Sequence, residues 1–201
     1  MRSVLAGLAL TTGAATADPF ADVAPCMTAL PTEEAYKEAL LALGWAEPEG
    51  ALLERASRAA GELAIVSMAA ILETRADVLT FAQRAREEAE ILISNGTLLM
   101  TKGEHNLWLY FSTAKDLPRV GCALTGKSLA IVRDAIPERP ENLTYGFVDV
   151  PSGHPVDGIS ALRVNAVRVF YPLFTGPLTA GGDALIVTAD LSAPFAGGAG
   201  E

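Results

Sequence analysis

The sequence predicts an α+β protein in which a helical N-terminal half packs on a C-terminal antiparallel β-sheet, with one disulfide joining the two. Apolar residues recur at spacings of three and four through residues 32–94, the period of an amphipathic helix. Over residues 97–190 the pattern changes to alternation by two, rich in β-branched and aromatic residues. The chain has two cysteines, Cys26 and Cys122, one in each half. We expect a single domain over residues 18–192.

The N-terminus has the pattern of an exported protein. Arg2 precedes an apolar run over residues 4–10, and the Ala-Thr-Ala of residues 15–17 fits the small-x-small rule of signal peptidase. We therefore expect residues 1–17 to be a signal peptide that is cleaved after Ala17. The mature protein is then periplasmic or secreted.

The cysteine count agrees with export, because an even number of cysteines in an oxidising compartment favours a disulfide. A Cys26–Cys122 bond closes a loop of roughly 97 residues, to which the chain-entropy model assigns about 4 to 5 kcal/mol of stability. Free thiols, or lipid attachment at Cys26, are the alternatives. The lipid alternative fits poorly because Pro25 stands where a small residue is needed.

Composition excludes several classes of partner. The formal net charge is −9, so the chain repels the phosphates from which nucleic-acid binders gain most of their affinity. Anionic lipid surfaces are disfavoured for the same reason. The longest apolar stretch, near residues 63–72, is far shorter than the roughly 20 residues of a membrane-spanning helix. We expect no membrane span and interpret this stretch as a core helix, with a strand as the alternative.

The helical half divides at capping and glycine positions. Thr32 is a good N-cap, and acidic residues follow it, so a helix is expected over residues 33–43. A second helix is expected over residues 51–60, ending at Gly61. Residues 62–94 form the strongest periodic segment and are predicted as one long helix or two helices with a break between them.

The second half reads as strands separated by loops rich in Pro and Gly. Residues 97–101 and 107–112 flank a polar turn and predict a β-hairpin. Further strands are expected at residues 121–124, 129–133, 145–150, 161–171 and 184–189. In the longest of these the alternation changes phase between Ala166 and Val167, which predicts a bulge there. Residues 193–201 are expected to form a disordered tail.

One stretch matches a motif with a known mechanism. Residues 121–128 fit GxxxxGKS, the phosphate-binding loop of nucleotide hydrolases. Such a loop must follow a buried parallel strand and open a helix, yet the preceding segment is short, charged and interrupted by Pro118. Nucleotide binding therefore remains only a further alternative.

The loop at residues 149–157 gathers Ser152, His154 and Asp157, which we take as candidate ligand- or partner-binding residues. Because loops concentrate function, a periplasmic hydrolase that uses this loop is the main alternative function. A plain turn, in which Asp and Ser side chains bond their own backbone, explains the same residues. The chain lacks HExxH, paired CxxC and GxSxG patterns, so we expect no catalytic residues, no metal and no cofactor.

The aromatic residues Trp45, Trp108 and Tyr110 are interpreted as core residues, with a ligand pocket as the alternative. By elimination, the sequence favours a non-enzymatic, exported binding or accessory protein. Its expected partner is another protein or a small apolar ligand.

Overall fold

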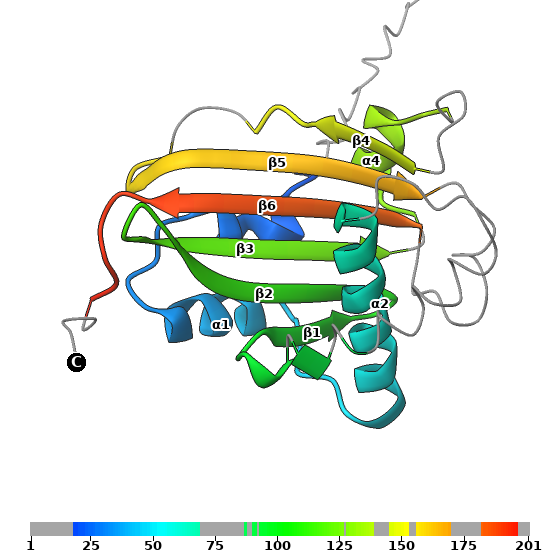
Figure 1. Ribbon diagram of the computed structural model, residues 1–201, viewed down its shortest axis with the longest axis horizontal. Coiled ribbons are helices and arrows are strands. Elements are labelled where there is room, and N and C mark those ends of the chain that lie inside the picture. The colour runs from blue at the N-terminus through cyan, green and yellow to red at the C-terminus, as the bar shows by residue number, and fades with distance from the viewer. Residues whose placement is uncertain are drawn as a thin grey trace, which may run out of the picture.

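The computed structural model is built around one six-stranded antiparallel sheet with the strand order β1-β2-β3-β6-β5-β4 (Figure 1). It describes residues 18–68, 87, 90, 91, 93–126, 128–138, 145–152, 156–169 and 182–196. The strands are β1 (Leu98–Lys102), β2 (His105–Ala114), β3 (Leu117–Gly126), β4 (Tyr145–Asp149), β5 (Ile159–Val169) and β6 (Asp183–Leu191). The predicted α+β class, with its antiparallel sheet, is confirmed. The expected signal peptide lies outside the described residues.

The first three strands form a meander, and the predicted hairpin is its first turn. β1 and β2 pair from Leu98 opposite Leu109 to Lys102 opposite His105. β3 is longer than predicted, because Pro118 does not interrupt it. The ladder to β6 starts only at Arg119, so the missing N–H of Pro118 falls before β3 becomes a central strand.

The first two α-helices keep most of the predicted pattern. The helix α1 (Glu33–Ala42) begins as expected, with the Thr32 side chain accepting a hydrogen bond from Ala35 N. The helix α2 (Gly50–Met68) runs straight through Gly61, so the predicted stop there is wrong. Its buried residues Ala56 and Leu63 are seven apart on one helix face. Their burial on the sheet outweighs the cost of about 1 kcal/mol of one helical glycine.

The end of the predicted long helix is confirmed, whereas its middle falls outside the described residues. Residues 87, 90, 91, 93 and 94 are helical, and the chain turns at Asn95 and Gly96. Gly96 has a φ of 82°, the left-handed conformation that commonly ends a helix. In the part of the chain that the structure describes, no helix is long and apolar enough to cross a membrane.

The prediction of a strand at residues 129–133 is wrong, because this segment forms the short helix α4 (Ala130–Ala135). Leu129, Val132 and Ile136 are all buried, at the three- and four-residue spacing of a helix. A five-residue apolar stretch fits the period of a helix and that of a strand equally well. The helix is favoured here by a contact with a residue that is distant in the sequence. The carboxylate of Asp183 accepts a hydrogen bond from the Leu129 N–H at the start of α4.

The bulge predicted between Ala166 and Val167 is also misplaced. The register of β5 with β6 shifts instead between Ile159 and Ala161, at the start of the strand. Ala166 and Val167 are consecutive, lie in the regular ladder and are both buried, one on each face of the sheet. The alternation of apolar residues along β5 changes because both faces of the sheet are buried here, so apolar side chains occur on both sides of a regular strand.

The first face of the sheet, which we call the disulfide-side face, carries the larger core. The 3-10 helix η1 (Ala21–Met27) and α1 pack on it, and the Cys26–Cys122 disulfide joins η1 to β3 with a Cα–Cα distance of 6.0 Å. Both cysteines are fully buried, and the predicted disulfide is confirmed. Phe195, within the stretch expected to be a tail, packs edge-to-face against Tyr36 and Phe111.

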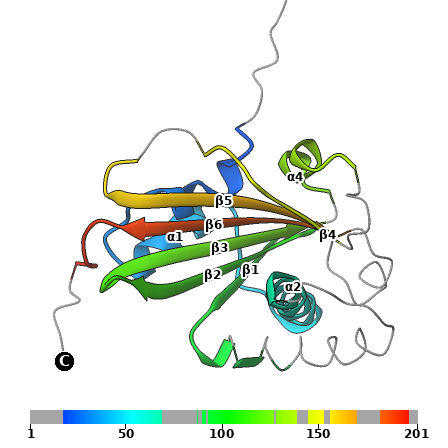
Figure 2. The ribbon, with the colours of Figure 1, turned by 45° about the horizontal axis from the view of Figure 1, so that its top comes forward.

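The opposite face, which we call the α2-side face, is covered differently. Figure 2 shows α2 on one side of the sheet and α1 with η1 on the other. Beneath α2 lies a second, smaller cluster of buried residues: Ala56, Leu63, Leu99, Trp108, Ala123, Val167 and Ala184. These residues occupy one end of the face, and α2 crosses the sheet at that end (Figure 1).

Candidate functional site

The candidate site follows from the alternation of side chains along the central strand β3. Cys122 points to the disulfide-side face, so Arg119, Gly121 and Ala123 point to the α2-side face. Ala123 lies in the cluster beneath α2. Arg119 and Gly121 lie nearer the N-terminal end of β3. The α2-side face thus has an apolar end and a polar end.

The strand register extends this polar end across the sheet. We call it the polar half-face and define it as Tyr110, Ser112, Arg119, Gly121, Arg163, Thr188 and Asp190. Directly opposed residues share a face, which places all seven on the α2 side. Arg163 and Ser112 are exposed, and none of the seven is fully buried except Gly121. Four strands, β2, β3, β5 and β6, therefore present side chains on one surface.

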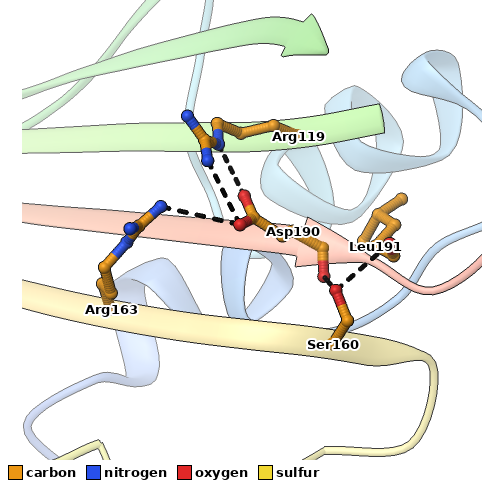
Figure 3. A network of polar contacts seen from close by, with 5 residues as sticks. All are labelled: Arg119, Ser160, Arg163, Asp190 and Leu191. Atoms are coloured by element: carbon orange, nitrogen blue, oxygen red, sulfur yellow. Dashed lines mark hydrogen bonds and ion pairs between the residues drawn. The ribbon is translucent and has the colours of Figure 1, made fainter. Parts of the chain in front are cut away.

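Asp190 is the centre of the charged part of this surface (Figure 3). Arg119 on β3 forms a two-pronged interaction with it, Nε to Oδ1 at 2.5 Å and Nη2 to Oδ2 at 3.1 Å. From the other side, Nη2 of Arg163 on β5 lies 3.6 Å from Oδ2. Arg119 is therefore hydrogen-bonded to the carboxylate, whereas Arg163 is only an ion-pair neighbour.

The electrostatics of the cluster follow from these contacts. The hydrogen bond from Arg119, followed by the charges of Arg119, Arg163 and Lys115, holds the pKa of Asp190 below its ordinary value. The same hydrogen bond raises the pKa of Arg119. Two guanidinium groups thus lie against one carboxylate, which leaves the cluster with a local positive charge in an acidic protein.

A second feature of the polar half-face is a row of side chains across four strands. Tyr110 lies opposite Gly121, Gly121 opposite Thr188, and Thr188 opposite Arg163. A Cβ on Gly121 would stand 1.9 Å from Cζ of Tyr110, so the phenol ring lies directly over this glycine. The absence of a side chain at Gly121 lets the ring cross β3 toward β6.

The described structure covers only part of the loop that the sequence singled out. Ser152 is half-buried and Asp157 is exposed, while His154 lies outside the described residues. Asp149, at the start of that loop, accepts a hydrogen bond from Asn165 Nδ2 at 2.5 Å. Whether the loop forms a hydrolytic site therefore stays a prediction.

The GxxxxGKS match lies largely inside β3. Residues 121–125 pair with β2 on one side and with β6 on the other, and Gly126 pairs with β6. A phosphate-binding loop needs backbone N–H groups that point at the phosphates, and here they belong to a sheet ladder. Lys127 lies outside the described residues, and Ser128 is exposed just before the six-residue helix α4. This placement gives nucleotide binding no support.

A second charged cluster has a structural role. Asp183 is 2% exposed and accepts hydrogen bonds from Leu129 N and from Arg133 Nε, both at 2.9 Å. Arg168 lies beside the same carboxylate and donates to the carbonyl of Ile136 at the end of α4. These contacts fasten α4 to β5 and β6. Among the described residues, no three His, Cys, Asp or Glu side chains are grouped so as to hold a metal ion.

Sequence reasoning missed the polar half-face because its residues are separated by long stretches of chain. Thr188 and Asp190 are polar at alternate positions near the end of a predicted strand, and Arg163 is charged within another. That alternation was visible, but only the register unites these residues with Arg119. No protein-family model, curated protein or solved structure matches this chain.

Proposed function

We propose that this protein is an exported, non-enzymatic binding protein that holds a partner protein on its polar half-face. One observation carries the proposal. In the part of the chain that the structure describes, η1, α1, α4 and the C-terminal segment pack on the disulfide-side face, whereas α2 packs on one end of the opposite face. A sheet with one covered face and one open, polar surface offers a platform on which another molecule can lie.

The character of the open surface favours a protein over a small apolar ligand. Its polar groups are the exposed Ser112 hydroxyl and Arg163 guanidinium group, with the half-buried Thr188 hydroxyl and Asp190 carboxylate beside them. Pockets for apolar ligands are lined mainly by hydrophobic and aromatic side chains. Protein interfaces that form and dissociate are enriched in arginine and tyrosine and have a polar rim, which is the composition found here.

Export is supported by the chemistry of the two cysteines. Both sulfurs are fully buried and joined to each other, as expected for a structural disulfide of a protein that folds in an oxidising compartment. The arginine beside an apolar run and the Ala-Thr-Ala of residues 15–17 add a route to that compartment. We place the protein in the periplasm or outside the cell.

The test combines localisation with surface-specific binding. We expect cell fractionation to recover the protein outside the cytoplasm, beginning at Asp18 and without free thiols. The purified protein is then immobilised in parallel with two variants. Thr188→Trp blocks the polar half-face, and Ala42→Trp adds the same bulk to an exposed position on α1.

The decisive result is a partner that binds wild type and Ala42→Trp but not Thr188→Trp, and that rebinds after purification with a fixed stoichiometry. A partner that is lost equally with both variants, or with neither, contradicts the assignment to this surface. Recovery of full-length protein with reduced cysteines in the cytoplasm contradicts export.

A further inference from the structure

We infer that Arg163, Thr188 and Tyr110 form a recognition site for the carboxylate of an acidic side chain on the partner protein. This inference rests on the proposed function and deepens it, because it names the chemistry by which the partner is held. Three observations support it: the unused hydrogen-bond donors of these side chains, the weak ion pair that holds Arg163, and the positive charge around Asp190.

The row across the sheet brings together donors that the fold leaves unused. Thr188 lies between Gly121 and Arg163, and the Tyr110 ring reaches over Gly121 toward the same strand. Among the described residues, none of the side chains of Tyr110, Thr188 and Arg163 makes a hydrogen bond to protein. Two hydroxyls and a guanidinium group can donate together to a group that only accepts. An ionised carboxylate is such a group.

Arg163 can turn to a ligand at little cost to the rest of the cluster. Asp190 already receives two hydrogen bonds from Arg119, so it does not depend on Arg163 for a partner. The Arg163 ion pair is long, at 3.6 Å, and its side chain is 56% exposed. A planar guanidinium group binds a carboxylate through two parallel hydrogen bonds, a geometry that Arg119 and Asp190 already display on this surface.

Charge favours a short acidic segment over an extended polyanion. Arg119 and Arg163 both pair with the single carboxylate of Asp190, so an anion close to the row is attracted. The protein as a whole carries a formal charge of −9, and most of that charge lies outside the cluster. A nucleic acid or an anionic membrane would extend into this repelling field, whereas one or two acidic side chains on a partner would not.

The test uses defined probes. The purified, disulfide-bonded protein, labelled with ¹⁵N and ¹³C, is titrated in NMR experiments with a capped Gly-Glu-Glu-Gly peptide. The matched Gly-Gln-Gln-Gly peptide and sodium phosphate serve as parallel probes at equal ionic strength. We expect the glutamate peptide to shift the signals of Tyr110, Thr188 and the Arg163 side chain saturably, and the glutamine peptide to leave them unchanged.

Variants assign the interaction to the row. Arg163→Gln should weaken peptide binding by about 10- to 100-fold, because it removes a charge-assisted contact. Arg163→Lys should recover only part of the loss, since it restores charge but not the planar fork. Tyr110→Phe and Thr188→Val each remove one hydroxyl and should weaken binding about 2- to 10-fold. The control Arg58→Gln removes a cation on α2 that pairs with Glu54, and should change nothing.

The outcomes separate this inference from the proposed function. Equal binding of both peptides, tighter binding of phosphate than of glutamate, or equal losses in Arg163→Gln and Arg58→Gln would each overturn the carboxylate site. If the natural partner is still lost with Thr188→Trp in those cases, the binding surface stands and only its chemistry is wrong. If Thr188→Trp has no effect on any partner, both proposals fail.

Discussion

The two faces of the sheet differ in how completely their polar groups are satisfied. On the disulfide-side face the Tyr36 hydroxyl donates to the Thr28 carbonyl at 2.9 Å and accepts from Leu30 N–H at 3.0 Å. Burial raises the pKa of this hydroxyl, so it stays a donor throughout the physiological range. On the α2-side face, within the described structure, the buried indole N–H of Trp108 has no hydrogen-bond partner.

The two faces therefore differ in how much they contribute to the core. The disulfide-side face holds a continuous core that includes a covalent link. The α2-side face has the smaller core, an unsatisfied donor and an open polar surface. Since the larger core and the covalent link lie on one face, we expect the stability of the fold to depend mainly on that face. Substitutions on the two faces should therefore have unequal effects on the free energy of unfolding.

The largest effect is expected from removal of the covalent link on the disulfide-side face. The Cys26→Ser, Cys122→Ser double variant should lose about 2 to 5 kcal/mol of stability, because the bond joins residues 96 positions apart and constrains the unfolded chain. Urea unfolding followed by circular dichroism measures the change. Dithiothreitol should reproduce the loss in wild type and leave the double variant unaffected. A loss below 1 kcal/mol would show that this face does not depend on its disulfide.

The next comparison uses neighbouring residues of β6 that point to opposite faces. Leu185 is fully buried on the disulfide-side face, and Ile186 is half-buried on the α2 side. Truncation to alanine removes the same number of carbon atoms from each. Leu185→Ala should cost about 2 to 5 kcal/mol, and Ile186→Ala about 1 to 2 kcal/mol. Equal losses in the same urea experiment would contradict the unequal roles of the faces.

The two tryptophans of the chain provide a third comparison. Trp45 Nε1 donates to the Asp22 carbonyl at 3.0 Å, whereas Trp108 Nε1 is buried without a partner. Replacement by phenylalanine removes a satisfied donor at the first position and an unsatisfied one at the second. Trp45→Phe should therefore cost about 1 to 2 kcal/mol more than Trp108→Phe. Thermal and urea unfolding of the two variants measure this difference, and the reverse order would mean that the indole of Trp108 finds a partner in solution.

The same contrast explains which parts of the fold could be predicted from sequence. The start of α1 and the β1–β2 hairpin follow from local signals, namely the Thr32 cap and alternation over a short stretch of chain. The helix α4 was mistaken for a strand because its start is fixed by Asp183, 54 residues away. Local patterns suffice where neighbours in sequence determine the structure, and they fail where a distant contact does.

The candidate site belongs to the second category. Each of Arg119, Arg163 and Asp190 looks like an ordinary exposed strand residue when its own segment is considered. Their proximity depends on two separate registers, β3 with β6 and β5 with β6. The sequence therefore led instead to the loop at residues 149–157, where Ser and His are close along the chain. Closeness along the chain was the only kind of proximity that the sequence could display.

The smallest effect concerns the charged centre of the polar half-face and its dependence on pH. The pKa of Asp190 is lowered in the folded protein, chiefly by its hydrogen bond with Arg119, relative to a value near 4 in an unfolded chain. A lowered carboxyl pKa stabilises the fold above the unfolded pKa, and the contribution is lost as the pH falls through the folded pKa. Because the pair lies near the surface, its contribution should be about 1 kcal/mol or less.

Asp190→Asn should consequently be less stable than wild type by a constant amount between pH 5 and pH 8, a window above the unfolded-state pKa of about 4. Below about pH 4 the two unfolding curves should converge, because wild type then loses the same interaction by protonation. Urea unfolding at a series of pH values measures this, with Asp157→Asn, an exposed carboxylate, as a control for the change in net charge. A gap that persists unchanged to the lowest pH would mean that Asp190 stabilises the fold through its shape and not through its charge.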